Sequence, residues 1–153
     1  MTTMTIVDVV NIVYPGQVAL GNVTFGQGDN GIVINSWTVP NQPQPTVESL
    51  EAQIPFLQAQ FDLSYFLTNG TPQLAAFVDA VAQQKQYSDA VSCASYINSS
   101  VANWKGEATT FIAWRDSVYN YVIAQEELMQ SGARTIPTFA EFQSELPVIA
   151  WTD

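Results

Sequence analysis

Three prolines within six residues, Pro40-Asn41-Gln42-Pro43-Gln44-Pro45, constrain the fold of this chain more than any other feature. Proline fixes φ and lacks an amide hydrogen, so the run excludes a regular helix and favours an extended spacer. Before it, the chain is rich in Val, Ile and Thr and is punctuated by Gly. After it, apolar residues recur with helical spacing. We therefore expect an α+β chain, with a small β-rich N-terminal module (1–40), a Pro/Gln linker (41–46) and an all-α helical module (47–153).

Short strands are expected in the first module, because β-branched and aromatic residues are enriched there. They cover residues 5–14, 18–25 and 31–39, and are separated by the turn signals Tyr14-Pro15-Gly16-Gln17 and Gly28-Asp29-Asn30-Gly31. For residues 5–14 a helix is an open alternative, since Ile6, Val9, Val10 and Val13 also have helical spacing.

Helices are expected throughout the second module. They run from Thr46 to a break at Pro55, from Phe56 to Leu67, onward from Thr71, from Tyr87 to Tyr96, from Glu107 to Gln130, and from Thr138 to Pro147. Asn69-Gly70 is predicted to end one helix, and Thr71 with Pro72 to begin the next. In the stretch 87–96, we expect Tyr87, Val91 and Ala94 on one face.

Composition argues against several classes of function. The chain has 14 acidic and 4 basic residues and a net charge of −10, which disfavours binding to nucleic acid or to an anionic membrane surface. It has no His, the commonest general base and metal ligand. Glu141 and Glu145 are best explained as a solvated helix face. We therefore expect no enzyme activity, catalytic residue, metal or cofactor, and the short apolar runs predict no membrane insertion.

Two single residues have more than one interpretation. Cys93, the one cysteine, is predicted to be a small buried side chain, and the alternative is an intermolecular disulfide. Arg115 adjoins Trp114 on the longest predicted helix. We expect it to anchor loops through carbonyl or carboxylate oxygens, the alternative being an ordinary exposed cation beside Asp116.

A series of short blocks follows the linker in a fixed order. The blocks are Pro43-Gln44-Pro45-Thr46, Tyr87-Ser88-Asp89, Ser92-Cys93-Ala94-Ser95-Tyr96, Trp104, Glu107-Ala108, Phe111, Ala113-Trp114-Arg115-Asp116-Ser117-Val118, Gly132-Ala133-Arg134, Pro137-Thr138, Glu141, Leu146-Pro147 and Trp151. With Gly31-Ile32, Trp37 and Leu50, this series resembles a segment of tail-fibre-associated proteins of tailed bacteriophages.

The resemblance implies a structural subunit of the phage tail, at the fibre or the fibre-to-baseplate attachment, that is synthesised in the host cytoplasm and retained in the virion. The alternative within the same family is a fibre-assembly chaperone that is not retained. The implied partners are other fibre or baseplate proteins, and the implied oligomer is a homotrimer. No catalytic or cofactor residue accompanies the resemblance. Its structural motif residues are Tyr96, Trp104, Trp114, Arg115, Asp116 and Trp151.

Overall fold

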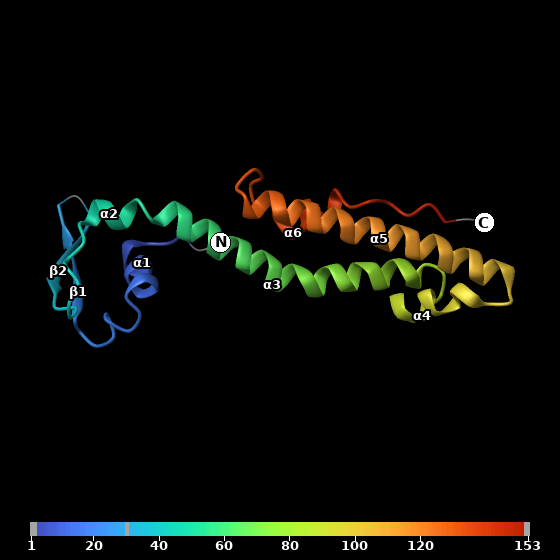
Figure 1. The fold of residues 1–153 in the computed structure, drawn as a ribbon, viewed down its shortest axis with the longest axis horizontal. Helices are drawn as coiled ribbons and strands as arrows, with labels where there is room; N and C mark the ends of the chain where they lie inside the picture. The colour runs from blue at the N-terminus through green and yellow to red at the C-terminus, as the bar shows by residue number, and fades with distance from the viewer. Residues whose placement is uncertain (1–2, 30, 152–153) are drawn as a thin grey trace. The chain divides into compact units, whose positions relative to one another are not determined.

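The computed structural model describes residues 3–29 and 31–151 and divides into two compact units, unit 1 (residues 1–62) and unit 2 (residues 63–153). Its two-stranded antiparallel sheet and larger helical part make a mixed α+β fold, as expected. Figure 1 labels the elements along the chain. In order they are α1 (Ile6–Val13), β1 (Val23–Gly28), β2 (Gly31–Trp37), α2 (Val47–Glu51), α3 (Ile54–Gln83), α4 (Ala90–Ser95), the 3-10 helix η1 (Tyr96–Asn98), α5 (Ala102–Gln130) and α6 (Phe139–Ser144).

Residues 6–13 form a helix, so the expected strand at 5–14 is wrong and the helical alternative is confirmed. A capping box starts α1: the Asp8 backbone N–H donates to Thr5 Oγ1 at 3.4 Å, and the Thr5 N–H donates to Asp8 Oδ2 at 2.7 Å. Ile6, Val9 and Val10 are buried, which is the spacing of one helix face. Capping and burial both favour the helix.

The two strands form one antiparallel hairpin, with Val23 opposite Trp37 and Gly28 opposite Gly31. The expected strand at 18–25 begins too early, because turns occupy residues 15–21 and Gly16 and Gly21 have positive φ. The first predicted turn is confirmed by a bond from the Gln17 N–H to the Tyr14 carbonyl at 3.2 Å. In the second turn, Asn30 lies outside the described residues.

The core of unit 1 draws on residues from both sides of the prolines. Leu50 of α2 is as fully buried as Val9 and Val10 of α1. Because α2 and the start of α3 pack on this core, the division between compact units lies between residues 62 and 63 rather than at 41–46. Residues 40–46 contain no helix or strand, and Trp37 Nε1 donates to the Gln42 carbonyl at 2.9 Å.

The predicted break at 69–72 is absent, since α3 continues through Pro72. Proline removes one backbone hydrogen bond from a helix interior. Side-chain donors add bonds on either side of that position: Thr71 Oγ1 donates to the Leu67 carbonyl and Gln73 Nε2 to the Asn69 carbonyl, each at 2.8 Å. The proline therefore lies inside the helix instead of starting it.

Gly70 is a packing residue of α3 rather than its end. It is buried, and a Cβ added there would lie 3.4 Å from Cδ2 of Phe139, the first residue of α6. The missing side chain thus leaves room for an aromatic ring from a distant part of the chain.

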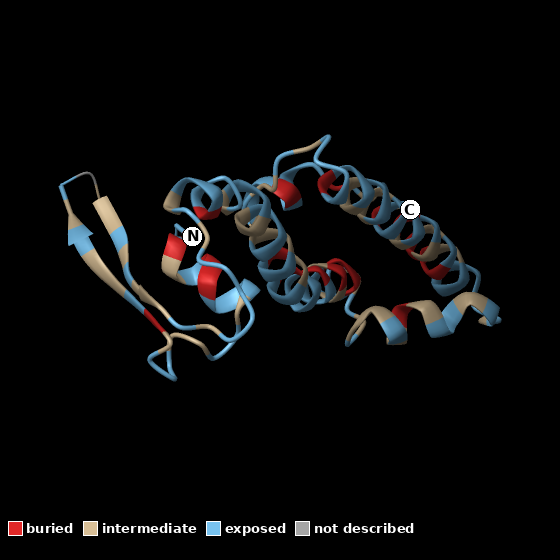
Figure 2. Cartoon of the chain, turned by 60° about the vertical axis from the view of Figure 1, so that its left-hand side comes forward, coloured by how far each residue is buried: buried red, intermediate tan, exposed pale blue. Residues whose placement is uncertain are grey.

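In unit 2, α5 returns alongside α3 in both ribbon views, and the buried residues gather where the two helices meet (Figures 1 and 2). Phe77 of α3 contacts Trp114 of α5 at a ring-centroid distance of 5.9 Å. α5 starts at Ala102, earlier than the expected Glu107. α6 begins after the Thr138 cap, as predicted, and ends at Ser144, ahead of Pro147.

The segment 87–96 differs from the prediction in length and in face. Asp89 caps α4, which begins only at Ala90, and η1 follows it. Val91 is 80% exposed, whereas Tyr87 and Ala94 are half-buried, so the expected common face of these three residues is wrong. Cys93 is fully buried, as predicted.

Candidate functional site

Trp114 and Trp151 hold the C-terminal segment of unit 2. Trp114 is 6% exposed, and its Nε1 donates to the Pro147 carbonyl at 2.8 Å. Trp151 stacks on Phe111 with ring centroids 6.2 Å apart, and its Nε1 donates to Gln84 Oε1 at 3.2 Å. These contacts secure the segment after α6 onto the rest of unit 2.

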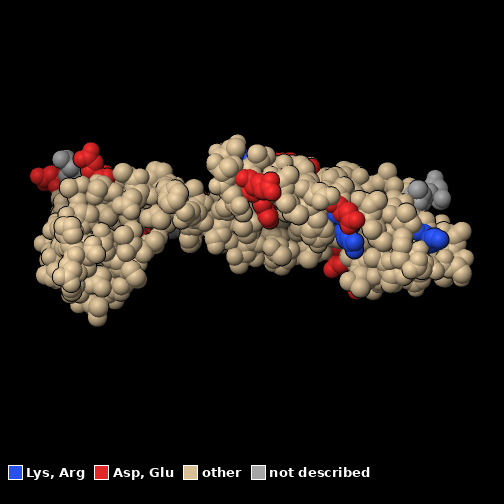
Figure 3. Space-filling model, in the orientation of Figure 1, with Lys and Arg blue, Asp and Glu red and all other residues tan. Residues whose placement is uncertain are grey.

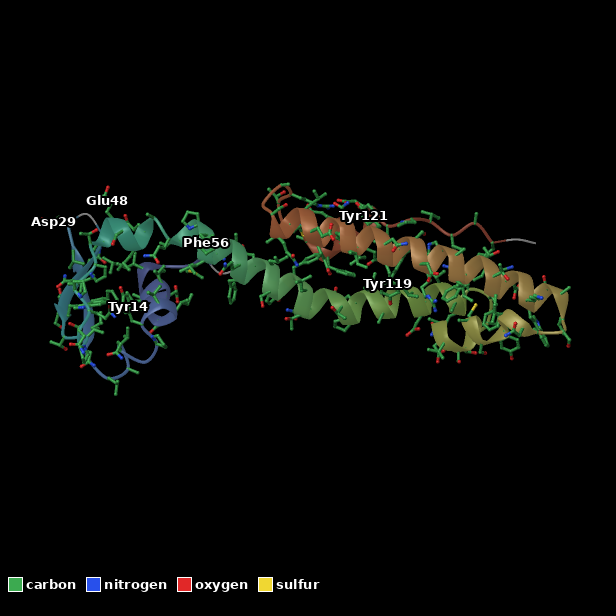
Figure 4. All side chains as sticks on the ribbon, viewed as in Figure 1. Tyr14, Asp29, Glu48, Phe56, Tyr119 and Tyr121 are labelled. Atoms are coloured by element: carbon green, nitrogen blue, oxygen red, sulfur yellow. The ribbon has the colours of Figure 1, made fainter. Side chains whose placement is uncertain are left out.

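Arg134, not Arg115, is the arginine that anchors a loop. Its Nη2 donates to both carboxylate oxygens of Glu145 at 2.7 Å, while the Tyr121 hydroxyl donates to Glu145 Oε2 at 2.6 Å. Its Nη1 also bonds Gln125. Arg134 lies between α5 and α6, so this network joins the loop to both helices. Tyr121 is labelled on α5 in Figure 4.

Arg115 takes the alternative role, that of an exposed cation. It pairs with its neighbour Asp116 at 3.2 Å, and both side chains remain partly exposed. The expected loop anchor at Arg115 is therefore wrong. The role of Arg134 could not be predicted from the sequence, because its partner Glu145 is eleven residues away, across a loop.

Glu141 and Glu145 have separate structural roles. Hydrogen bonds from the Thr138 backbone and hydroxyl lower the pKa of Glu141, which completes the cap of α6. Hydrogen bonds from Tyr121 and then Arg134 lower the pKa of Glu145. Both carboxyls are thereby held ionised, and Glu145 is more than the solvated residue expected from its spacing.

Glu107 is the buried charged residue among those that the structure describes. The Tyr87 hydroxyl donates to its Oε2 at 2.7 Å, and Lys85 Nζ lies 3.5 Å from its Oε1. Burial, followed by this hydrogen bond, raises the pKa of Tyr87. Lys85 also lies over the Trp151 ring, with Nζ 5.7 Å from the centroid. The buried carboxylate is thus satisfied by groups of its own unit.

Cys93 is fully buried in unit 2. Burial, with a smaller effect of Glu107, raises the pKa of its thiol to about 11. Disulfide formation requires an accessible thiolate, so both properties oppose the proposed intermolecular bond. The structure favours the packing interpretation.

Tyr96 and Trp104 form a partly exposed aromatic pair. Their ring centroids lie 5.5 Å apart at 76°, and Trp104 is 46% exposed. Tyr96 also contacts Tyr87, at 5.4 Å. The six motif residues thus form three separate groups. Trp114 and Trp151 both contact Phe111. Tyr96 contacts Trp104, and Arg115 pairs with Asp116.

Unit 1 contains a pocket of about 280 Å³ between α1 and the first turns of α3. Met4, Ile12 and Phe61 supply apolar walls. Its polar lining includes Asp8, Asn11 and Gln58. Gln58 Oε1 accepts a bond from the Met4 N–H at 2.6 Å. The sequence showed no sign of this pocket, because it requires α1 to be a helix.

Within residues 3–29 and 31–151, no cluster of three or more Cys, Asp or Glu side chains is arranged to hold a metal ion. No described helix has the length and hydropathy needed to cross a membrane. Comparison with known proteins identifies no matching family model, no matching curated protein and no matching solved structure.

Proposed function

We propose that this chain is a protein-interaction subunit of a bacteriophage tail, placed at the tail fibre or at the attachment of the fibre to the baseplate. The proposal rests on the series of blocks that resembles tail-fibre-associated proteins. The contacts made by Trp114, Pro147 and Trp151 are compatible with it, because they give these residues a structural rather than a catalytic role.

The observation that best supports an interaction role is the amount of apolar side chain left in contact with solvent. Large apolar surfaces rimmed by polar groups are typical of protein contact sites. Only 12% of the residues are charged, and most of the face drawn in Figure 3 is uncharged. The side chains that are half exposed or more include Ile12, Leu20, Phe56, Phe61, Tyr65, Val91, Ile123 and Val148.

Mass spectrometry of purified particles tests the proposal. Tailed-phage particles are purified on a density gradient from lysates in which the chain is made, and each tail protein is quantified. We expect the chain in the particle band at a fixed ratio to the fibre protein. Its absence from that band, with the chain abundant in the lysate, would contradict retention in the virion.

The second candidate is a fibre-assembly chaperone, favoured by the small size and the acidic charge of the chain. It predicts a complex with the fibre protein in the lysate and none in the finished particle. The same two samples therefore separate the candidates.

We also propose that copies of the chain associate, with a trimer as the expected state. Unit 1 has no Lys or Arg, so contact between two copies of unit 1 would place carboxylates against carboxylates. Contact between copies therefore best uses unit 2, where Tyr119 and Ile123 are exposed one turn apart on α5. Sedimentation equilibrium at micromolar concentration measures the state, and a monomer would contradict it.

A further inference from the structure

The pocket of unit 1 has apolar walls that could bind an apolar side chain of another protein. Ile12 of α1 is 50% exposed and Phe61 of α3 is 52% exposed, although both line the same hollow of about 280 Å³. Two large apolar side chains on the walls of one pocket lose their contact with water only when something fills it. Met4, 9% exposed, adds a third apolar wall.

The charge of the surrounding unit has one sign. Residues 1–62 include no Lys or Arg and contain the acidic residues Asp8, Asp29, Glu48, Glu51 and Asp62. The face of unit 1 drawn in Figure 3 accordingly shows acidic but no basic side chains. Asp8 is itself part of the pocket lining. Hydrogen bonds from the Thr5 hydroxyl and backbone lower its pKa, so its carboxyl is ionised at neutral pH.

We propose that this pocket docks a segment of a partner protein in which a large apolar side chain is flanked by Lys or Arg. The apolar side chain fills the hollow between Ile12 and Phe61, and a flanking cation faces Asp8, the carboxylate of the pocket lining. Complementary charge of this kind sets partner choice and speeds association. This inference deepens the proposed function, since it names the chemistry of one partner.

A second copy of the chain fits this pocket poorly. Another unit 1 would bring carboxylates and no Lys or Arg. In unit 2, three of the four Lys and Arg side chains already pair with carboxylates, in Lys85–Glu107, Arg115–Asp116 and Arg134–Glu145. The fourth, Lys105, is a single exposed cation in a chain of net charge −10. Like charges at a contact oppose association, so the partner is a basic segment of a different protein.

The test uses the full-length chain and a random twelve-residue peptide library displayed on yeast. Clones that bind the wild-type chain are selected and sequenced, and their affinities are then measured against three proteins. These are wild type, Phe61→Ala, which removes a pocket wall, and the control Phe56→Ala. Phe56, labelled in Figure 4, is also on α3 and is 66% exposed. It is not part of the pocket lining.

We expect the selected peptides to share a large apolar residue next to Lys or Arg. Phe61→Ala should weaken their binding by about tenfold or more, whereas Phe56→Ala should change it by less than about twofold. Binding should also weaken as salt is added. Far-UV circular dichroism of each variant establishes that it is folded, and Ile12→Ser, from the opposite wall, provides a second pocket variant.

The proposal is overturned if no peptide is selected, if the selected peptides lack basic residues, or if both pocket variants bind as well as Phe56→Ala. It is also overturned if the methyl resonances of Met4 and Ile12 shift with protein concentration alone, since a second copy would then be the occupant. The particle experiment is independent of this one. A chain that is absent from particles but binds basic peptides contradicts the proposed tail function and leaves the pocket inference standing.

Discussion

Trp114 joins two roles in one side chain, because its ring is buried between α3 and α5 while its N–H secures the segment after α6. Replacing a buried large aromatic residue by Ala costs about 3–5 kcal/mol of unfolding free energy. We expect that loss for Trp114→Ala, measured by urea unfolding followed by circular dichroism. Trp104→Ala, at a residue that is 46% exposed, is the matched control and should lose much less. Equal losses in the two variants would show that burial does not distinguish them.

Glu145 should make stability depend on pH. Hydrogen bonds from Tyr121 and Arg134 lower the pKa of Glu145 in the folded chain. The ionised carboxylate is therefore more stable in the folded chain than in the unfolded chain. The resulting stability is fully present above the ordinary pKa of a glutamate. It is lost as the pH falls through the lowered value.

The measurement is the difference in unfolding free energy between wild type and Glu145→Gln from about pH 7 to about pH 3. We expect the difference to be largest at neutral pH and to shrink on acidification. The lowered pKa of Asp8, which does not depend on Glu145, is common to both proteins and cancels. Glu127→Gln, at an exposed position on α5, is the control. A difference that is constant over this range would contradict the network.

Cys93 should react slowly with thiol reagents in the folded chain. The cause is burial, which hides the sulfur and raises its pKa to about 11. We expect iodoacetamide at about pH 8 to modify the folded chain at least about a hundredfold more slowly than the chain in urea. Non-reducing gels should show only monomer. Rapid modification, or a heavier band that reductant removes, would restore the disulfide interpretation.

At the scale of elements, α3 shows how a local stop signal is overridden. Gly70 lies in the helix interior, where Phe139 packs against it. An added Cβ at 3.4 Å makes an ordinary van der Waals contact, so Gly70→Ala should be tolerated. It should raise the unfolding free energy by about 0.5–1 kcal/mol through helix propensity.

Gly70→Leu tests the same geometry in the opposite direction. Its additional atoms have to displace the Phe139 ring, and overpacking of this kind costs about 1–3 kcal/mol. Urea unfolding of both variants measures the effects. If Gly70→Ala and Gly70→Leu change the unfolding free energy in the same direction, the close approach of α6 to α3 at this position is wrong.

The elements differ in how far sequence alone could define them. Helix caps are recognisable from neighbouring residues alone. Thr138 predicted the start of α6, and the Thr5–Asp8 capping box favours a helix over a strand for residues 6–13. The continuity of α3 was not predictable from the local stop signals at Asn69-Gly70 and Pro72, and the contact of Gly70 with Phe139 joins residues far apart in the chain. The pairing of Arg134 with Glu145 depends in the same way on the path of a loop.

At the scale of the whole chain, each unit has a core of its own. The expected division at the prolines assumed that a composition change marks a boundary, but α2 contributes Leu50 to the earlier core. The pocket of unit 1 could not be predicted from composition either, because its walls come from α1 and α3, which lie on opposite sides of the prolines.

Covalent footprinting tests the proposed interaction role most directly. A carbene-generating reagent labels the isolated chain and gradient-purified phage particles, and mass spectrometry quantifies the labelling of each peptide. We predict that Phe56, Phe61, Tyr65 and Ile123, each more than half exposed in the isolated chain, are labelled several-fold less in the particle. Surface residues outside the contacts should keep their labelling and serve as the internal reference. Equal labelling of these four residues in both samples would contradict an interaction role in the tail.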